Sequence, residues 1–310
     1  MSKPQSNIAI ILVNWNGIAD TMDCLHSLQK IEQQNFDCII VDNASVINPA
    51  SELLNAFPDI ILLRQEQNLG FAGGNNKGIE YAMANNYEYI LLLNNDTIVD
   101  PGFLNPLVDC LNNNPLLSAV QPLIYFHNQP NTIWSAGGIW NKWLGDSFTI
   151  KHLNTKETFI NRDWLTGCAF FVRAATLKQL GGFNNKLFAY YEDVDLSFRI
   201  NTKHNALALV PTSIIYHKVS ASVNASSITK NEKQISNKEG KLNPLVHYWN
   251  ARNRIWLIKK YQPWFTLPTT ILSVFIYYSF VCIYFIVRGR FNKLKAVLKG
   301  IWEGCTQTMD

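Results

Sequence analysis

Cysteine pairs of the metal-binding or redox kind are missing from this 310-residue chain. Its six cysteines are scattered along the sequence, and no two of them form a CxxC pair. This pattern argues against a structural zinc site and against a disulfide framework, and it fits a reducing compartment. No signal peptide is expected, because residues 1–7 are polar and lead directly into an apolar strand.

Charged residues are missing from residues 262–287, where Ile, Phe, Tyr, Val and Leu dominate. The stretch is long enough to cross a bilayer. Lys and Arg stand on both sides of it, which gives a single span no clear orientation. A peripheral or re-entrant segment that returns to the same face fits these flanks better, while a single span and a buried helix of a soluble domain are the alternatives.

Acidic and basic residues are unevenly divided along the chain. Residues 1–217 carry 13 Lys and Arg against 19 Asp and Glu, a net charge of −6, and residues 218–310 carry 14 against 4, a net charge of +10. An acidic body with a basic tail favours a cation site in the body and attraction of the tail to an anionic membrane surface. We expect no nucleic-acid partner. We expect a body over 1–217, a mobile linker over 218–243 and a helical, membrane-associating region over 244–310.

Short apolar runs alternate with helical patterns at the start of the chain. Strands are expected at 8–13, 36–41, 60–63 and 89–93, with helices at 19–31 and 51–57 and a third helix that follows a glycine-rich turn at 70–74. This rhythm predicts βαβ units and an α/β fold with a mostly parallel sheet. Asn or Asp follows three of these strands, at the edge where such sheets bind ligands.

The pattern is less regular after residue 100. We expect strands at 119–125, 168–172, 207–210 and 214–216, a hairpin turned by Gly137 and Gly138, and helices at 174–180, 192–201 and 245–261.

Candidate chemistry begins where the apolar run Tyr89–Leu93 ends in Asn94, Asn95 and Asp96. A carboxylate flanked by amides at this edge can hold a hard divalent cation through oxygen ligands. A polar turn that closes the strand is the plain alternative. Asp42 ends the second strand and can accept the imide N–H of uracil or thymine or bind a ribose hydroxyl, although an Asx turn uses the same residues.

Two further segments carry candidate groups. The glycine-rich stretch from Asn68 to Asn75 precedes a helix, where backbone N–H groups suit phosphate, but it is neither a P-loop nor a GxGxxG motif. Glu192 and Asp193 lie near the start of another helix and can do acid–base chemistry, although such acidic clusters are also common on surfaces. Asp195 can pair with Arg199 one turn later, which is a structural role.

Together these segments resemble the inverting glycosyltransferases of family 2, which have the GT-A fold. The rhamnosyltransferase-like members that build bacterial polysaccharides are the most similar. The matching segments occur in the family's order: Val13–Gly17, Val41–Ser45, Asn68–Asn75, Leu93–Thr97, Trp164–Gly167, Gly181–Phe183, Tyr191–Asp195 and Tyr216–His217. The resemblance covers residues 7–217 and implies a GT-A catalytic domain over 1–217, with a nucleotide-binding half to about residue 100 and an acceptor half from 101 to 217.

The resemblance also implies roles for individual residues. Asp42 would recognise the nucleobase, and Asp193 would be the general base, with Glu192 beside it. Asp96 would be the remaining acid of the family's Asp-x-Asp motif and would hold Mg²⁺ or Mn²⁺ with His217, although Asn94 replaces the first acid. The expected contacts to the nucleotide sugar come from Asn14, Asp42, Asn68, Gly73, Asn75, Asn94, Asn95, Trp164, Gly167 and Arg199.

The resemblance implies transfer from dTDP-L-rhamnose or a UDP-sugar to a saccharide or lipid-linked saccharide at the cytoplasmic face of the cell membrane. Three other classes of protein are alternatives to this function. A sugar-nucleotide pyrophosphorylase usually has a basic, glycine-rich loop after the first strand, and residues 14–17 have no Lys or Arg nearby. A processive synthase would show Gln-x-x-Arg-Trp, which is absent. A non-catalytic, membrane-bound interaction protein on a decayed GT-A scaffold would explain Asn94.

Overall fold

The computed structural model describes residues 7–32, 35–201, 206–219 and 242–309. The chain forms two compact units. Unit 1 consists of Met1–Ile139, Thr149–Phe188 and Glu192–Lys218, and unit 2 of Trp140–Phe148, Ala189–Tyr191 and Val219–Asp310. Two short segments from within residues 1–217 therefore pack with the C-terminal helices. Most of the predicted linker over 218–243 lies outside the described residues.

Unit 1 is built on one large sheet. Its parallel part has the order β3–β2–β1–β4 and comprises β1 (Ile8–Asn14), β2 (Phe36–Asp42), β3 (Ile61–Arg64) and β4 (Tyr89–Leu93). The sheet continues from β4 through the antiparallel β11 (Ala169–Arg173) to β6 (Leu117–Phe126), β12 (Ala206–His217) and β10 (Ile160–Asn161). Two further strands, β5 (Thr97–Val99) and β7 (Gln129–Ser135), pair with β12 and β6. The predicted α/β class with a mostly parallel central sheet is confirmed.

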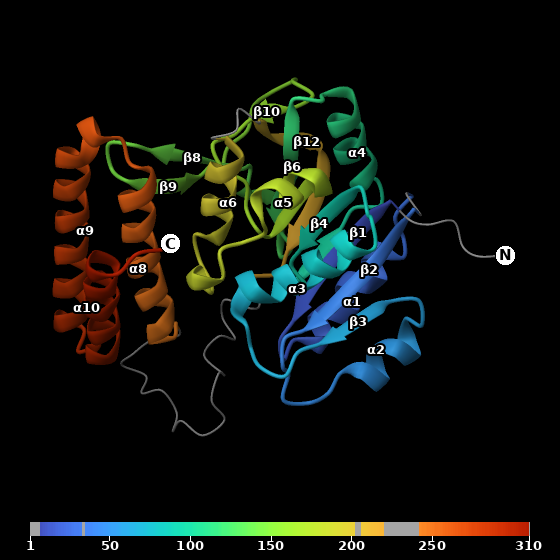
Figure 1. The fold of residues 1–310 in the computed structure, drawn as a ribbon, viewed down its shortest axis with the longest axis horizontal. Helices are drawn as coiled ribbons and strands as arrows, with labels where there is room; N and C mark the ends of the chain where they lie inside the picture. Colours follow the sequence, from blue (N-terminus) through green and yellow to red (C-terminus); the bar gives the residue numbers. More distant parts are fainter. Residues whose placement is uncertain (1–6, 33–34, 202–205, 220–241, 310) are drawn as a thin grey trace. The chain divides into compact units, whose positions relative to one another are not determined.

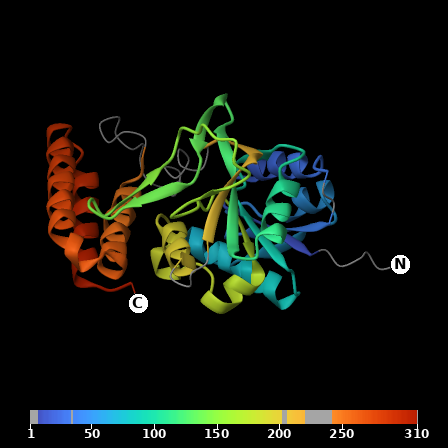
Figure 2. The same ribbon diagram turned by 90° about the horizontal axis from the view of Figure 1, so that it is seen from above.

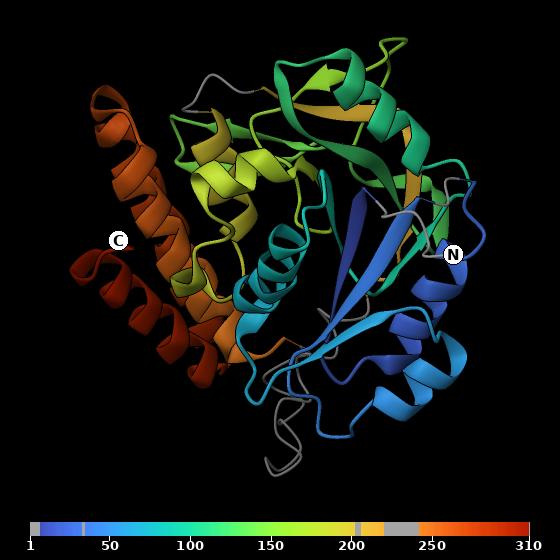
Figure 3. The same ribbon diagram turned by 45° about the vertical axis from the view of Figure 1, so that its right-hand side comes forward.

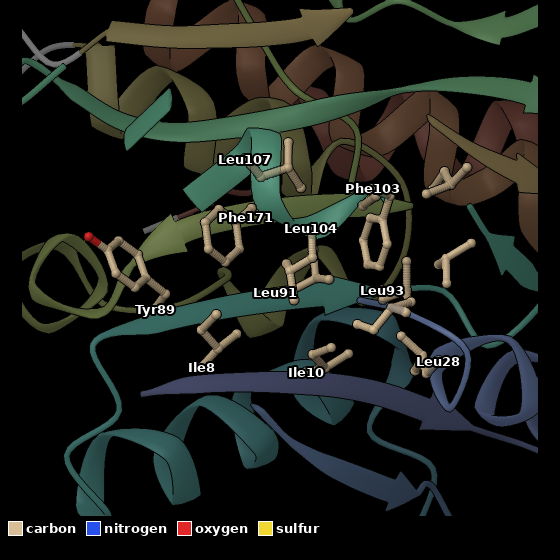
Figure 4. Close-up of a cluster of buried hydrophobic side chains, with 14 of the residues drawn as sticks. Ile8, Ile10, Leu28, Tyr89, Leu91, Leu93, Phe103, Leu104, Leu107 and Phe171 are labelled. Carbon is tan, nitrogen blue, oxygen red and sulfur yellow. The ribbon is translucent and has the colours of Figure 1, made fainter. Parts of the chain in front are cut away.

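Helices cover both faces of this sheet because its central strands are apolar on both sides. Alternate residues such as Ile8 and Ile10 face one core with α1 (Ile18–Leu28), α2 (Ala50–Ala56) and α4 (Leu104–Asn113) (Figure 4). Ala9 and Ile11 face the other core with α3 (Gly70–Ala84), α5 (Ala174–Leu180) and α6 (Glu192–Asn201). Figure 3 shows α3 on one side of the blue strands and α1 and α2 on the other.

The glycine-rich turn predicted at 70–74 is wrong, because α3 begins at Gly70 and includes these glycines. The reason is close packing of the helix on β1. A Cβ on Gly74 would lie 2.9 Å from Val13 Cγ1, and one on Gly78 would lie 2.4 Å from Ile11 Cγ2. The glycines bring the helix axis near the sheet, which overrides their low helix propensity.

Two other strand predictions need correction. The strands expected at 207–210 and 214–216 are one strand, β12, with a register shift between Val210 and Ile214. Pro211 follows Val210 and lacks the N–H that regular pairing needs, which suits a bulge. The hairpin expected at Gly137 and Gly138 is also wrong, since β7 pairs with β6, whereas β8 (Gly138–Asn141) pairs with β9 (Asp146–Thr149).

Unit 2 contains three long helices that lie side by side, α8 (Pro244–Tyr261), α9 (Leu267–Val287) and α10 (Phe291–Thr306) (Figures 1 and 2). Two glycines let α8 and α10 approach closely. A Cβ on Gly300 would lie 2.5 Å from the Tyr248 carbonyl oxygen, and one on Gly304 would lie 2.9 Å from Ile255 Cβ. The predicted apolar helix is confirmed: Trp264–Val287 is long and apolar enough to cross a membrane.

Two polar side chains of α8 bind the two short segments of residues 1–217 that belong to unit 2. Arg254 is buried; its Nη2 lies 3.4 Å from Asp146 Oδ2, and its Nε donates to the Gly145 carbonyl at 2.9 Å. Asn253 Nδ2 donates to the carbonyls of Ala189 at 3.0 Å and Tyr190 at 2.8 Å. The Tyr190 backbone is left-handed, with φ of 70°, a conformation that needs such support in a non-glycine residue.

Unit 2 should lose stability in mild acid because of His247. Burial, and then the charges of Lys293 and Arg290, lower the pKa of this imidazole from 6.5 to about 4. Between about pH 6.5 and 4, His247 is therefore protonated in the unfolded chain but not in the folded chain. The free energy of unfolding falls as the pH is lowered through this range. Chemical unfolding in detergent at pH 7.5 and 5.0 should show this fall.

The matched variant His247→Gln should show a smaller difference in the free energy of unfolding between pH 7.5 and 5.0, because glutamine does not titrate. His127→Gln is the control, since His127 is exposed on the sheet unit. If the free energy of unfolding of His247→Gln falls between pH 7.5 and 5.0 as much as that of the wild type, His247 is not the cause of the fall.

Candidate active site

Polar side chains from three strand ends form one hydrogen-bonded row at the carboxyl edge of the parallel strands. Asn14 and Asp42 are register partners at the ends of β1 and β2, and Asn14 Nδ2 donates to Asp42 Oδ1 at 2.9 Å. Thr21 Oγ1 donates to Asn14 Oδ1 at 3.0 Å and accepts from Asn95 Nδ2 at 2.9 Å. The row therefore runs from the end of β2 to the segment after β4, as the polar strand ends predict.

Asp42 is fully buried at one end of this row. Its Oδ1 accepts from Asn14 and, at 2.5 Å, from Ser45 Oγ. Its Oδ2 lies 3.3 Å from Arg64 Nη1 in an ion pair but receives no hydrogen bond from the described residues. A buried carboxylate oxygen without a donor has a strong tendency to accept one from a ligand.

Asp96 and His217 meet beyond the other end of the row. Both are buried, and His217 Nε2 lies 3.0 Å from Asp96 Oδ1. β12 pairs with β5 here, with His217 opposite Thr97, so the contact between residues 121 positions apart follows from the sheet. Burial alone would lower the pKa of His217, but Cys168 and the adjacent Asp96 carboxylate raise it to about 10. The other ring nitrogen, Nδ1, is buried and has no hydrogen-bond partner in the part of the chain that the structure describes.

A divalent cation fits these residues if the donor shares it. Among the described residues, no group of three or more His, Cys, Asp and Glu side chains could hold a metal ion. A carboxylate and an imidazole are nevertheless ligands that suit Mn²⁺, and cations of this kind are commonly bound by one or two carboxylates together with substrate phosphates. Asp96, with the amide of Asn94 nearby in sequence and with His217 once a cation has displaced its proton, would form a partial shell that a diphosphate would complete.

Asp193 is held in place by two backbone N–H groups. It is half-buried in the first turn of α6; its Oδ2 accepts from the Gly167 N–H at 2.9 Å and its Oδ1 from the Val194 N–H at 2.8 Å. Burial raises its pKa, while these hydrogen bonds act in the opposite direction. The result is a carboxylate that is more basic than an exposed aspartate, which suits a general base.

Glu192 differs from its neighbour. It is buried, and its Oε2 has no hydrogen-bond partner in the described part of the chain. Burial and then the adjacent charge of Asp193 raise the pKa of Glu192 well above the usual range. The two adjacent carboxyl groups therefore differ: Glu192 Oε2 has no hydrogen-bond partner among the described residues, whereas Asp193 accepts from two backbone N–H groups.

The segment just before β11 links Asp193 to the residues after β4. Gly167 holds Asp193, and the next residue, Cys168, accepts a hydrogen bond at its carbonyl from the Asn94 N–H at 2.8 Å. Gly167 also packs closely on Phe71, whose ring would lie 3.0 Å from a Cβ there. A larger residue at 167 would have to displace the Phe71 ring.

The structure gives the glycine-rich stretch contacts within the protein. The N–H groups of Leu69 and Gly70 donate to the side chains of Asn43 and Asn68, and the N–H of Ala72 donates to the Phe188 carbonyl. These three donors at the start of α3 are therefore not available to phosphate. Asn75 is buried and donates to a carbonyl of its own helix, and Gly73 allows the contact with Leu69.

Two other predicted contact residues have structural partners. Arg199 binds Asp195 Oδ2 at 2.8 Å and donates to the carbonyls of Leu180 and Gly182, which fixes α6 as the i,i+4 spacing predicts. Trp164 is buried against Gly138, and its Nε1 donates to the Ile139 carbonyl at 3.2 Å. The structure brings neither residue into the row or to Asp193, and a sugar-nucleotide role for them stays a prediction.

Sequence reasoning missed two groups at this edge. Lys218 Nζ binds Asp20 Oδ1 at 3.1 Å and Asp23 Oδ2 at 2.6 Å, which ties the end of β12 to α1. Arg64 pairs with Asp42 because β3 and β2 are in register there. The sequence offered two weak signals for these groups: Lys218 directly follows His217, and Arg64 lies at the end of the third strand.

This fold and this site define a class of nucleotide-sugar-dependent transferases, and the comparisons with known proteins agree. Residues 9–181 match the family model described as glycosyl transferase family 2, so the chain belongs to that family and is a glycosyltransferase. It is 26% identical, over 219 residues, to the N-acetylglucosaminyl-diphospho-decaprenol L-rhamnosyltransferase of Mycobacterium tuberculosis; the match covers 63% of this chain and 70% of that protein.

Solved structures share the fold. GalNAc-T7 with UDP, GalNAc and Mn²⁺ superposes with a TM-score of 0.60 at 18% identity, covering 68% of this chain and 43% of that one. The mannosyltransferase PcManGT from Pyrobaculum calidifontis, in complex with GDP-Man and Mn²⁺, superposes with a TM-score of 0.57 at 12% identity, covering 97% and 88%. At this level of identity the likeness concerns the fold, and the predicted GT-A fold is confirmed.

Proposed function

We propose that this glycosyltransferase moves one sugar from a nucleoside-diphosphate sugar to a hydroxyl of a saccharide or lipid-linked saccharide, in the synthesis of a cell-surface polysaccharide. The observation that best supports this is the Gly167 N–H bond to Asp193, which fixes a basic carboxylate next to the segment that carries Asp96. A fixed base beside a site for the leaving diphosphate is what a single displacement requires.

Asp193 takes the proton of the acceptor hydroxyl as its oxygen attacks the anomeric carbon. The bond from that carbon to the diphosphate breaks at the same time, its electron pair leaves with the nucleoside diphosphate, and the anomeric configuration inverts. No covalent intermediate forms. A divalent cation held by Asp96 and His217 would neutralise charge on the departing diphosphate. The neighbouring Glu192 is buried, and its pKa is raised by burial and by the adjacent charge of Asp193, which leaves the proton transfer to Asp193.

The donor proposed first is dTDP-L-rhamnose or a UDP-sugar. Asp42 favours a nucleobase with an imide N–H. Its buried Oδ2 accepts no hydrogen bond from the described residues, and the N–H of uracil or thymine can supply one. The relative from Mycobacterium tuberculosis is named an L-rhamnosyltransferase with a diphospho-decaprenol substrate. That name supports rhamnose as the first sugar to test and a lipid-linked acceptor at the cytoplasmic face of the membrane.

UDP and dTDP should compete for the donor site about tenfold or more better than GDP, which is the size expected for one hydrogen bond to a charged group. Asp42→Ala should narrow this difference, whereas Asp59→Ala, at an exposed aspartate of the same unit, should preserve it. The measurement is displacement of a labelled nucleotide from the purified protein. GDP binding tightest would contradict the role of Asp42.

A donor screen tests the function as a whole. Purified full-length protein with Mn²⁺ is incubated with single nucleotide sugars, and release of the nucleoside diphosphate is measured with and without a lipid-linked acceptor. We expect one dTDP- or UDP-sugar to be turned over and transferred. Binding of no nucleotide sugar would contradict the proposal and favour a scaffold without catalysis.

A further inference from the structure

Unit 2 has a long apolar face that no described residue covers. Outward side chains of α9 are largely exposed, including Phe275 at 71% and Phe280 at 69%. The same face carries Ile271, Leu272, Ile276, Ile283 and Val287. Soluble surfaces rarely expose so large a contiguous patch unless it binds something.

The opposite face of α9 packs within unit 2. Thr270, Tyr278 and Phe285 are buried, and Val274 and Val281 pack partly beside them. Steps of three and four residues place these five side chains on one side of the helix. Their neighbours are Ala251 of α8 and Val297 of α10. The helix thus has one face in protein and one face open along its whole length.

Charged groups lie behind the midpoint of α9. The Arg254 guanidinium lies 5.0 Å from the ring of Tyr277, a residue at the middle of the helix, and it is paired with Asp146. If α9 crossed a bilayer in this packing, this pair would enter the hydrocarbon centre. The backbone of residues 142–145 would also enter the bilayer, because its carbonyls contact Thr270 and Arg254. Buried charge and irregular backbone are both strongly disfavoured there.

Cations flank the apolar face. Lys260 precedes α9 and Arg288 follows it, both exposed. On α10 an exposed stripe of Phe291, Leu298 and Trp302 includes Lys295, whose long side chain can reach past the apolar groups to a phosphate. Anionic lipid matches this pattern. A second copy of the chain would place the same cations opposite one another, which opposes a symmetric contact.

We propose that α9 lies in the plane of an anionic bilayer surface, with its outward face among the acyl chains and its inner face on α8 and α10. An interfacial helix of this kind buries one side only, as the packing requires. Both ends of α9 then stay on the same side of the membrane. The inference deepens the proposed function by naming the surface on which it operates, and it rests on that function for the lipid-linked acceptor.

A depth scan along α9 tests the inference. Single cysteines from 271 to 287 are spin-labelled in full-length protein bound to phosphatidylglycerol and phosphatidylethanolamine vesicles, in a background with Cys282→Ala and Cys305→Ser. The other four cysteines are shielded, because burial raises the pKa of each thiol. Oxygen and a water-soluble nickel complex report the depth of each label.

An in-plane helix should give a depth that oscillates about every 3.6 residues, with positions 276 and 287, which lie about three turns apart on the same side of the helix, at similar depth. A single maximum near 277, with both ends in water, would show a span and overturn the proposal. Labels that never meet acyl chains, in a protein that dimerises through α9, would also overturn it. The scan needs no sugar donor, so its outcome is separate from that of the donor screen.

Matched charge variants provide a second readout. Phe280→Glu should weaken vesicle binding about tenfold or more, because it removes a large buried apolar side chain from the lipid. Leu116→Glu is the control, since Leu116 is 80% exposed on unit 1. Equal effects of the two variants would overturn the assignment of the lipid face. Vesicles of phosphatidylcholine alone should bind more weakly, and added salt should weaken binding only on anionic vesicles.

Discussion

Asp193→Asn should lower the rate of sugar transfer by a factor on the order of 10²–10⁴, the usual range for loss of a general base. The carboxamide keeps the size of the side chain and can still accept from Gly167, but it cannot take the acceptor proton. Donor binding should therefore stay close to normal. Turnover on the acceptor and calorimetric binding of the donor are the two measurements.

The control for this variant is Asp109→Asn, which makes the same change at an exposed position of α4. Glu192→Gln separates the two adjacent carboxyl groups, because a rate loss as large as that of Asp193→Asn would move the base to Glu192. Near-normal turnover of Asp193→Asn would contradict the proposal. Burial raises the pKa of Asp193, so the wild-type rate should fall with decreasing pH already above the usual range of an aspartate.

Asp96→Ala should reduce kcat/KM by a factor on the order of 10² or more, since a bound cation contributes several kcal/mol to stabilising charge on a leaving group. The variant removes the carboxylate that contacts His217 and should abolish any dependence of the rate on Mg²⁺ or Mn²⁺. Asp96→Asn, which keeps the shape of this buried side chain, is made in parallel so that misfolding is not mistaken for lost metal binding. Rates are measured over a titration of Mn²⁺.

Asn94→Asp gives the opposite test. It restores the first acid of the Asp-x-Asp motif and should lower the Mn²⁺ concentration needed for half-maximal rate, because an added carboxylate strengthens binding of a hard cation. Wild-type activity that is unchanged in EDTA would contradict the cation role. His217 and backbone amides would then have to hold the diphosphate.

The row at the strand ends could be predicted because each step uses local sequence only. A buried parallel strand has an apolar run, and the polar residue after it lies at the carboxyl edge. This placed Asn14, Asp42 and Asp96 correctly at one edge without knowledge of strand order. The order of the segments then identified the family, which the match over 9–181 confirms.

The features that were missed depend on distances between elements. The contact of Arg64 with Asp42 needs the register of β2 and β3, and that of Lys218 with α1 needs the path of β12. The glycines of α3 indicate a turn in the sequence because glycine has a low helix propensity. The sequence alone does not show that β1 packs against the helix where the glycine side chains are absent. Whether a backbone N–H is free for phosphate also depends on acceptors far away in sequence, as the Phe188 carbonyl shows.

The hydrogen bonds from Asn253 and the Arg254–Asp146 pair have a consequence for hybrid enzymes. Exchange of C-terminal helices between related transferases would usually be made at one junction near residue 217. Such a hybrid would keep 140–148 and 189–191 from one parent and their partners on α8 from the other. A hybrid that folds should therefore need three exchanged segments, and the shortest of them ends one residue before Glu192.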